Sequence, residues 1–592
     1  MNRALKSHFR GTISDLREVP ERTKPRADSC NLATMARAAL NYLRGNPDPA
    51  RNYECKFTLG PLGIPCHFPE WAKQDEYGYD PISLGDTDAR MAMQYAHMRE
   101  MAGVPDPDAV ERGVIARVLG YLREDNYAWI NPAAYVGKHV DGLYVGTWTT
   151  GKALYVLSEA WLQTGEEAAR RKARQVFEAL RDLAQWDGER AWYMGIAPWR
   201  DGQWLMDGWC EQHGRNYPFI VEPLVRYWEC TGDEDALHLA CAFAEGFLAG
   251  SQPDMRAQRI DPQSGAFQGH VHLHTHGIWG VAHLGAVLND RRYLDWVRKA
   301  YEFVVASGTD YGWHPEFIPQ QRYVTEICVD GDMASLAAWL ARGGEPHYWD
   351  HLERTARNEL RRSQFALTPE FLELFERLHR DKPADVVGKA LAELRKLEGG
   401  FVAQAAFDDW VGYPSAEMGQ AGIARNGIQM MGCCPPEGMR GLYEAWAGTV
   451  EESGDGRVYV NMAFTRNHPA ARVRASSPAD GRLDVTAGQA GTFHVRPPAW
   501  AERDRVTACR NGAQQPVAWG GPASAYVVFE NVKKGDTLAL RWPVPAFTQT
   551  FVPTSIPDKR PEVRVQWVGN EVQAVEPPGE YLRMFRPEAA ED

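Results

Sequence analysis

Two adjacent cysteines, Cys433 and Cys434, carry the strongest chemical signal in the sequence. They stand in the run GCCPPE (432–437), where two prolines follow them directly. A disulfide between neighbouring cysteines would need a strained ring and a distorted peptide. The prolines fix two φ angles and stop a helix, so we expect a rigid loop that presents two free thiols. Such thiols could bind a soft metal in a reducing compartment, and two buried structural cysteines are the alternative.

A second segment, TEIC (325–328), could supply the donors that this pair lacks. Residues two positions apart share a face in an extended segment, and helical periodicity begins only after this segment, near Asp330. Glu326 and Cys328 could therefore face one ion from a pre-helical strand. One carboxylate and three thiolates form a chemically acceptable tetrahedral zinc set, although only the fold could bring the two segments together.

Helical repeats must position these residues. Several segments share a pattern of two helices separated by a turn with Gly or Asp, and their apolar residues recur at three- and four-residue steps. Long loops rich in aromatic and polar residues connect them, and such loops usually carry function. We therefore expect a closed α/α toroid around a cleft, with an open α-solenoid as the alternative. The segments are 154–180, 224–248, 280–304 and 336–360, with a fainter copy at 95–122.

The period of the apolar residues changes to two from about residue 455. Short strands such as RVYVNMAF and GTFHVRPPAW alternate with Gly, Pro, Asn and Asp turns, which is typical of a β-sandwich. The predicted fold class is mainly α with β, a toroid followed by a C-terminal β-sandwich. The predicted organisation is an N-terminal segment packing on the fold (1–80), the toroid (81–449), and the sandwich with a poorly specified tail (450–592).

Composition excludes several classes of protein. The chain has 592 residues, 44% of them apolar and 24% charged, as in ordinary soluble globular proteins. Its net charge of −13 argues against binding to nucleic acid or an anionic membrane. No run approaches the ~20 apolar residues of a membrane span, and the N-terminus lacks an apolar signal core. Since the ten cysteines do not indicate a disulfide framework, we expect a cytoplasmic protein.

The motifs together resemble a known family. The Glu-x-Cys segment ahead of a helix, the Cys-Cys-Pro-Pro run and the later pattern FHVRPPAWA…NG…VKKGDTLALRWP are similar to the β-L-arabinofuranosidases of glycoside hydrolase family 127, over roughly residues 80–550. The resemblance implies an (α/α)6 barrel followed by β-sandwich modules, and a glycoside or oligosaccharide substrate. It also implies that zinc is bound by four residues and that the first cysteine of the pair is the nucleophile. The implied ligands are Glu326, Cys328, Cys433 and Cys434.

The implied chemistry is coherent with these residue types. A coordinated thiol is deprotonated, so zinc would hold Cys433 as a thiolate near neutral pH. Its attack would form a thioglycosyl intermediate, which water resolves with net retention of configuration. A carboxylic acid must protonate the leaving oxygen and then act as base toward water. The resemblance places this Glu upstream of Glu-x-Cys.

Two residues compete for the acid/base role. We favour Glu316, in GWHPEF (312–317), because the adjoining aromatic residues could raise the pKa of its carboxyl by desolvation. Asp310 is the alternative, because its distance from Glu326 is nearer to the family spacing. A structural role for Glu316 is the remaining reading.

Four histidines alternate in the run GHVHLHTHG (269–277), which predicts that they share one side of an extended segment ahead of a helix near Ile278. Alone, the run could form a second metal site. The resemblance instead implies a contact with the sugar, for which His272 fits best, and we add His276 as a second contact. Structural roles are expected for His270 and His274.

Asp86 and Trp148 are further candidates for sugar binding. Asp86, in LGDTDARMA (84–92), could orient hydroxyls or cap a helix that begins near Ala89. Trp148 could stack on a sugar face, as could Trp204 and Trp209, although aromatic residues more often fill cores.

The chain departs from the family pattern beside the expected sugar site. The family has Asn after Cys-Cys-Pro-Pro, where this chain has Glu437, and the family's His shortly before the pair is absent from QMMG (429–432). Arabinofuranose is thus the default substrate, with another furanose or a branched acidic sugar open. The alternatives are a metal-independent toroid enzyme (uronyl hydrolase or isomerase) and a non-catalytic carbohydrate-binding protein. A homodimer also stays open.

Overall fold

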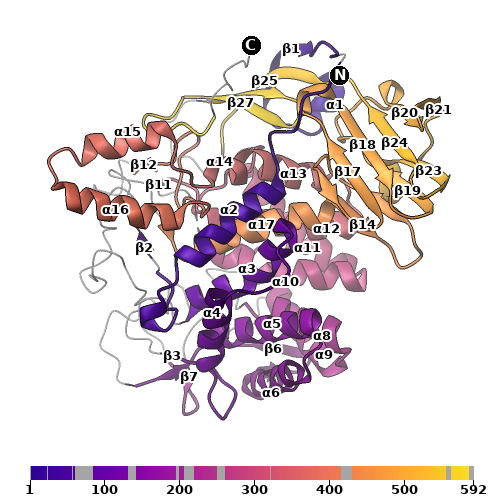
Figure 1. The fold of residues 1–592 in the computed structure, drawn as a ribbon. Coiled ribbons are helices and arrows are strands. Elements are labelled where there is room, and N and C mark those ends of the chain that lie inside the picture. The colour runs from indigo at the N-terminus through magenta and orange to yellow at the C-terminus, as the bar shows by residue number, and fades with distance from the viewer. Residues whose placement is uncertain are drawn as a thin grey trace.

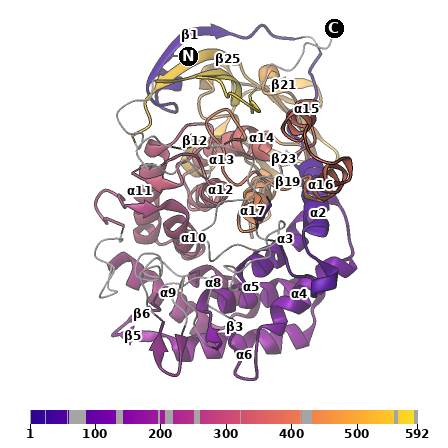
Figure 2. The same ribbon diagram turned by 90° about the vertical axis from the view of Figure 1, so that its left-hand side faces the viewer.

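The protein is described here from a computed structural model, in which helices dominate one end and sheets the other (Figures 1 and 2). The predicted sugar contact Trp209 lies outside the described residues. Among the described helices, none combines the length and apolar character that a membrane span requires. The described ranges are 2–22, 24–56, 58–59, 85–130, 142–194, 199–205, 219–249, 260–319, 322–411, 413–414, 430–554 and 562–585.

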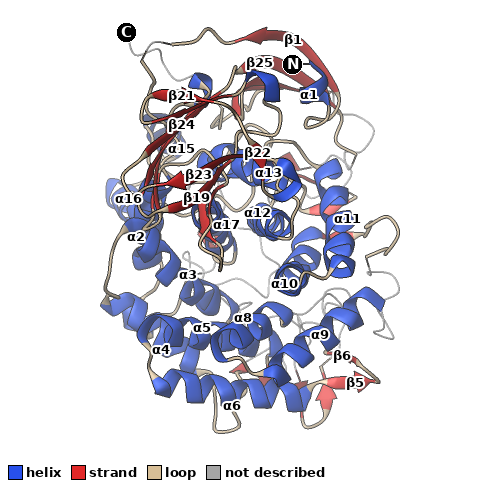
Figure 3. Ribbon diagram, turned by 90° about the vertical axis from the view of Figure 1, so that its right-hand side faces the viewer, coloured by secondary structure: helices blue, strands red, loops and turns tan. Residues whose placement is uncertain are grey.

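A closed ring of inner helices forms the centre of the toroid (Figure 3). Each helix packs on the next, and the last returns to the first. Their side chains are buried around almost the whole circumference, as expected for helices enclosed by other helices. In order around the ring they are α3 (Asp86–Ala102), α5 (Thr147–Thr164), α8 (Val221–Thr231), α10 (Val271–Leu288), α12 (Ile327–Arg342) and α17 (Cys434–Thr449).

Outer helices cover this ring. An outer helix follows each of the first five inner helices and packs on it, while α2 (Leu32–Gly45) packs on α3 and α17. Each predicted repeat therefore spans one inner and one outer helix, which confirms the toroid and excludes the open solenoid. Gly165 and Gly232 end α5 and α8 in the left-handed conformation that glycine favours. The outer helices are α4 (Ala109–Gly120), α6 (Glu167–Leu183), α9 (Glu234–Ala249), α11 (Arg291–Ser307) and α13 (Tyr348–Thr355).

Two antiparallel-rich sheets follow α17 and form the predicted sandwich. Burial alternates along strands such as β18 (Arg482–Ala487), so one face of each sheet meets the core. The five-stranded sheet has the order β14 (Val450–Glu452), β15 (Val458–Val460), β19 (Gly491–Val495), β23 (Tyr526–Val532) and β22 (Trp519–Gly520). The six-stranded sheet has the order β16 (Arg466–Asn467), β17 (Ala471–Ala475), β18 (Arg482–Ala487), β24 (Thr537–Arg541), β20 (Thr507–Arg510) and β21 (Ala513–Gln515).

The two ends of the chain meet in a third sheet, which the sequence did not predict. Its order is β1 (Thr12–Glu18), β25 (Pro545–Phe551), β26 (Val563–Val568) and β27 (Glu571–Glu576). The N-terminal strand β1 pairs with β25, beside the short helix α1 (Asn2–Lys6). The segment read as a poorly specified tail therefore contributes two regular strands to this sheet.

Shorter elements complete the toroid. After α13 the chain passes through a π-helical turn (Ala356–Leu360), α14 (Arg361–Ser363), α15 (Pro369–Leu378) and α16 (Ala384–Leu397). Among the described residues, four two-stranded sheets and one four-stranded sheet lie in the loops. They are β9 (Gly269–His270) with β10 (Phe317–Ile318), β11 (Arg322–Tyr323) with β12 (Tyr413–Pro414), β2 (Thr58–Leu59) with β13 (Met430–Met431), β5 (Gln185–Asp187) with β6 (Arg190–Trp192), and the sheet β3 (Trp129–Ile130), β4 (Tyr144–Val145), β7 (Trp199–Arg200) and β8 (Gln203–Trp204).

Four predictions of where a helix begins were wrong. The helix α3 begins at Asp86 rather than near Ala89. The helix α12 begins at Ile327 rather than near Asp330, so Cys328 lies in its first turn. The helix α17 begins at Cys434, and the two prolines occupy its first turn, where the backbone N–H that proline lacks would have no partner in the helix. The helix α10 begins at Val271, so the predicted extended histidine run is helical.

Candidate metal centre and active site

The candidate site lies at the N-terminal ends of four inner helices. Cys328 is the second residue of α12, Cys434 the first of α17 and Asp86 the first of α3, while His270 caps α10. Helix N-termini present unpaired N–H groups and a partial positive charge. The ring therefore gathers groups that favour thiolate and carboxylate anions at one end.

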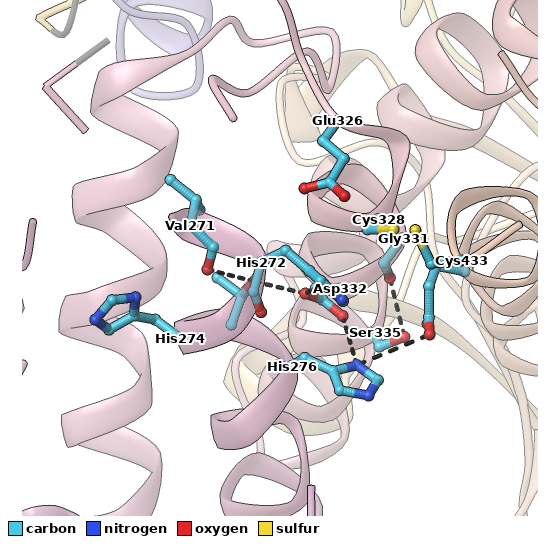
Figure 4. Close-up of polar contacts among 12 residues, drawn as sticks. Val271, His272, His274, His276, Glu326, Cys328, Gly331, Asp332, Ser335 and Cys433 are labelled. Atoms are coloured by element: carbon cyan, nitrogen blue, oxygen red, sulfur yellow. Dashed lines mark hydrogen bonds and ion pairs between the residues drawn. The ribbon is translucent and has the colours of Figure 1, made fainter. Parts of the chain in front are cut away.

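Four potential metal donors converge at this end, although they come from distant parts of the sequence. Figure 4 labels three of them, Glu326, Cys328 and Cys433. The Sγ atoms of Cys328 and Cys434 lie 3.3 Å apart, and those of Cys433 and Cys434 lie 3.6 Å apart. The Cys434 Sγ lies 3.7 Å from Oε1 of Glu326. All four ligand atoms lie within 4.8 Å of one another.

Gly331 allows α12 and α17 to approach closely enough for this convergence. A Cβ atom at this position would lie 2.2 Å from the backbone oxygen of Glu437. Any larger residue would push the two helices apart, and with them Cys328 and Cys434.

The spacing of the donors fits zinc. Zn–S bonds are about 2.3 Å long, so sulfur atoms at the corners of a tetrahedron around zinc lie about 3.8 Å apart. The shortest separations observed between donor atoms, 3.3 to 3.7 Å, lie close to that value. Soft sulfur donors with one carboxylate also match the ligand preference of zinc.

The electrostatics of the cluster favour negative charge on Cys433 and Glu326. Hydrogen bonds from the thiols of Cys328 and Cys434 lower the pKa of Cys433 well below its ordinary value, against the effect of burial. Burial raises the pKa of Cys328 and Cys434 themselves. Burial also opposes the charge on Glu326, but attraction to His270 and a hydrogen bond with it outweigh burial and lower the pKa of this carboxyl to about 2.

Extended segments bring Glu316 and His270 to the same cluster. Phe317 of β10 pairs with His270 of β9. The backbone N–H of Glu316 donates to the backbone oxygen of Val324 at 3.1 Å. The Nε2 of His270 donates to Oε2 of Glu326 at 2.6 Å. The ligand atoms of His270, Glu316 and Glu326 lie within 4.8 Å of one another.

Asp310, the competing acid/base candidate, is engaged elsewhere. Its Oδ1 forms an ion pair with Nε of Arg10 at 2.8 Å, and its Oδ2 accepts from the backbone N–H of Arg10 and from Gln549. Burial opposes its charge, but attraction to Arg10 and Arg354 lowers the pKa to about 2. These contacts tie Asp310 to the sheet at the chain ends.

The helical conformation separates the four histidines. On α10, His272 and His276 share a face and both contact Asp332, at 2.8 Å and 3.2 Å from their Nδ1 atoms. His274 lies on the other side of the helix (Figure 4), where its ring stacks on Phe267. The predicted alternation along one side of a strand is therefore wrong.

Both ring nitrogens of His272 are engaged. Because an arginine can only donate, the contact of 3.1 Å from Nη1 of Arg90 makes Nε2 of His272 an acceptor, and Nδ1–H then donates to Asp332. Nδ1 of His276 lies 3.2 Å from Asp332 and 3.5 Å from Nη1 of Arg440, whereas its buried Nε2 has no hydrogen-bond partner among the described residues. Burial lowers the pKa of His276 well below its ordinary value, so its ring is neutral.

The second potential metal group, formed by His272, His276 and Asp332, does not fit a cation. The guanidinium of Arg440 already pairs with Asp332 at 2.5 Å, and Thr275 donates to its other oxygen at 2.6 Å. The carboxylate is thus neutralised and its oxygens are occupied. Hydrogen bonding, rather than metal binding, explains this group.

Asp86 and Trp148 lie together, but Asp86 does not cap a helix near Ala89. The helix α3 begins at Asp86 itself, whose carboxylate accepts from Nε1 of Trp148 at 2.6 Å and from Nε of Arg90 at 2.7 Å, and pairs with Lys152. Trp148 also stacks on His276, with ring centroids 5.2 Å apart. Both residues therefore belong to the network around the histidines.

A buried ion-pair network explains the acidic residue that departs from the family pattern. Glu437 pairs with Nη1 of Arg90 at 2.5 Å and with Nη2 of Arg440 at 2.8 Å. Sequence reasoning missed these arginines, Lys152 and the link from His270 to Glu326. Two of the pairs had a signal in the sequence, because Arg90 lies four residues after Asp86 and Arg440 three after Glu437 on helices.

Comparison with solved structures shows that the chain has a known fold. Neither known protein families nor curated proteins gave a match to the sequence. Among solved structures, the chain is similar to a GH127 β-arabinofuranosidase, BT3674, with a TM-score of 0.57 and 14% identity over 92% of this chain and 81% of that one. The shared property is the fold.

Two more solved structures agree. Ara127N, a GH127 β-L-arabinofuranosidase from Geobacillus stearothermophilus T6, has a TM-score of 0.55 and 14% identity over 91% of this chain and 80% of its own. A structure described as a glycoside hydrolase has a TM-score of 0.55 and 14% identity, covering 89% and 85%. The expected architecture, a toroid followed by a β-sandwich, is thereby confirmed.

Proposed function

We propose that the protein is a zinc-dependent, retaining glycoside hydrolase that acts on a β-L-arabinofuranoside or a related furanoside. The observation that carries this proposal is the convergence of Glu326, Cys328, Cys433 and Cys434 beside the carboxyl of Glu316. Likeness in fold to GH127 enzymes supports the class of substrate.

The four converging residues would hold the metal. When bound, zinc would keep the coordinated sulfurs ionised at neutral pH. Cys433 is the candidate nucleophile because its side chain is partly exposed, whereas Cys328 and Cys434 are fully buried. This difference in burial supports assigning the attack on the substrate to Cys433.

In the first chemical step, the Cys433 thiolate attacks the anomeric carbon, and a C–S bond forms as the bond to the leaving oxygen breaks. Glu316 donates its proton to that oxygen. In the second step, Glu316 takes a proton from water, the water oxygen attacks the same carbon, and the C–S bond breaks to return the thiolate. Two inversions give net retention.

The network beside the cysteines would bind the sugar. Asp86 retains partial exposure for a hydroxyl. Trp148 would line the sugar site, with His276 stacked on its ring and Lys152 over it. His276 would contribute Nε2, the ring nitrogen that has no hydrogen-bond partner among the described residues. His272 would act indirectly, because both of its nitrogens already hold Arg90 and Asp332 in place.

Metal analysis joined to a hydrolysis assay tests the proposal. We expect one zinc per purified chain, loss of zinc in Cys328→Ala, and hydrolysis of aryl β-L-arabinofuranosides with retention, read from the first-formed anomer by NMR. Cys241→Ala, on the outer helix α9, is the matched control and should change neither property.

Each of the other outcomes would indicate a different function. Zinc without turnover on a panel of aryl furanosides and pyranosides would indicate a carbohydrate-binding protein. Turnover in a zinc-free protein would indicate the metal-independent toroid enzyme. Unchanged hydrolysis in Cys433→Ala would refute the nucleophile assignment.

A further inference from the structure

Asp330 has a position in the site that neither metal binding nor the chemical steps explain. It lies in the first turn of α12, two residues after Cys328, and its side chain is fully buried. It is not one of the four converging donors. A buried carboxyl group needs strong hydrogen-bond partners to be retained.

Its hydrogen-bond partners among the described residues lie on the two extended segments next to the cluster. One carboxylate oxygen, Oδ1, accepts from the backbone N–H of His314 at 3.1 Å and from Nδ1 of the same residue at 2.9 Å. The other oxygen, Oδ2, accepts from Oγ1 of Thr325 at 2.7 Å. Both partner residues are buried as well.

These partners stand directly beside the two functional carboxylates. His314 lies two residues before Glu316, and Thr325 immediately precedes Glu326. The two segments are antiparallel neighbours, joined by a bridge between Pro315 and Thr325. One carboxylate on α12 therefore holds both segments against the helix that carries Cys328.

We propose that Asp330 is a positioning residue that fixes the carboxyl of Glu316 relative to Glu326 and Cys328. This inference rests on the proposed function, in which Glu316 is the acid/base. Proton transfer requires close alignment of donor and acceptor, and a misplacement of about 1 Å can lower a rate by roughly a hundredfold. Removing Asp330 would leave buried donors on His314 and Thr325 without an acceptor, which favours displacement of both segments.

The neighbouring carboxylate shows that this connection is specific to Asp330. Asp332 is equally buried and lies on the same helix, but its partners are His272, His276, Thr275 and Arg440, on α10 and α17. It contacts neither extended segment in the hydrogen bonds of the described residues. The two aspartates thus hold different parts of the site.

Three variants test the proposal. Asp330→Ala removes both connections. In Asp330→Asn, the amide oxygen can still accept from His314, and the amide N–H can donate to the hydroxyl of Thr325. This variant should therefore keep the wild-type position of Glu316. Thr325→Val removes one connection and keeps the side-chain shape, which provides a milder variant in case Asp330→Ala does not fold. Ser335→Ala is the matched control, because Ser335 is buried on α12 and bonds to its own helix.

The first readout is the dependence of kcat on the leaving group of aryl furanosides. We expect Asp330→Ala to slow poor leaving groups by roughly a hundredfold and good ones much less, because acid assistance matters most for poor ones. Thr325→Val should show the same pattern more weakly, with the zinc content kept in both. An equal loss for all leaving groups would overturn the inference.

The second readout is independent of activity and separates this inference from the proposed function. Crystal structures of the variants should show the Glu316 carboxyl displaced from Glu326 in Asp330→Ala and Thr325→Val, but unmoved in Asp330→Asn and Ser335→Ala. Unmoved segments in Asp330→Ala would refute the positioning role, whether or not the enzyme hydrolyses furanosides. Displacement without any glycosidase activity in the unmodified protein would refute only the proposed function.

Discussion

Replacing Glu437 with Gln should destabilise the protein strongly, because it removes one side of a buried ion-pair network. Glu437 pairs with Arg90 and Arg440, and all three side chains are at most 4% exposed. The change preserves shape but leaves two buried guanidinium groups with one carboxylate partner fewer. Breaking a buried pair in this way typically reduces stability by about 3–5 kcal/mol.

The structure places the expected value at the lower end of that range. Arg90 keeps Asp86 at 2.7 Å, and Arg440 keeps Asp332 at 2.5 Å. We therefore expect a loss of about 3 kcal/mol for Glu437→Gln, and a similar loss for Arg90→Met, which removes the cation. Since both variants break the same pair, the double variant should lose about 3–4 kcal/mol rather than the sum of the two.

Urea unfolding followed by tryptophan fluorescence measures these differences, since the chain has 21 Trp residues. Glu178→Gln is the matched control, because its pair with Arg174 on α6 is exposed on both sides and contributes little. Additive losses in the double variant, within about 0.5 kcal/mol, would show that Arg90 and Glu437 are not coupled and would refute the reasoning.

Four other perturbations test the site. Removal of metal with a chelator should abolish hydrolysis and lower the unfolding midpoint, and zinc should restore both. Burial, followed by repulsion from Arg90, lowers the pKa of Lys152 from an ordinary value of 10.5 to about 7. Attraction to Asp86 opposes this shift but does not cancel it. Because the unfolded chain then binds more protons between these values, stability should rise as the pH increases from about 7 toward 10.5, and Lys152→Met should flatten that rise in pH-dependent unfolding. Glu316→Gln should slow the hydrolysis of substrates with poor leaving groups most. Asp310→Asn should lower the unfolding midpoint without changing the dependence of the rate on the leaving group. If the two variants showed the opposite pattern, Asp310 would be the acid/base. Gly331→Ala should reduce zinc content by separating α12 from α17, and full zinc occupancy in this variant would refute the role given to their close approach.

The toroid could be predicted from the sequence because its determinants are local. Apolar residues at three- and four-residue steps mark each helix, and Gly165 and Gly232 mark the turns. The prediction of a closed ring rested on the long loops between the helices, because the contact that closes it, α17 on α3, joins segments far apart in the sequence and leaves no local pattern. The third sheet escaped prediction for the same reason, since β1 and β25 are distant in the sequence.

The donor residues of the site could be named, but their local conformations could not. Proline after Cys434 suggests a helix stop, but the first turn of a helix tolerates proline, and α17 begins there. The alternating histidines suggested a strand, but on a helix the spacing of four between His272 and His276 lets both reach Asp332. The partner of Glu326 was missed because His270 reaches it through the pairing of β9 with β10.

The positive groups around the cysteines act together to offset the negative charge of the metal donors. Three thiolates and one carboxylate would carry four negative charges, of which a divalent cation offsets two. The N-termini of α12 and α17 supply partial positive charge at the same point. Arg90 adds a full buried charge, which helps to lower the pKa of Cys433. Glu437 in turn neutralises Arg90 on its other side, so an acidic residue after the two prolines is the expected consequence of placing an arginine beside the thiolates.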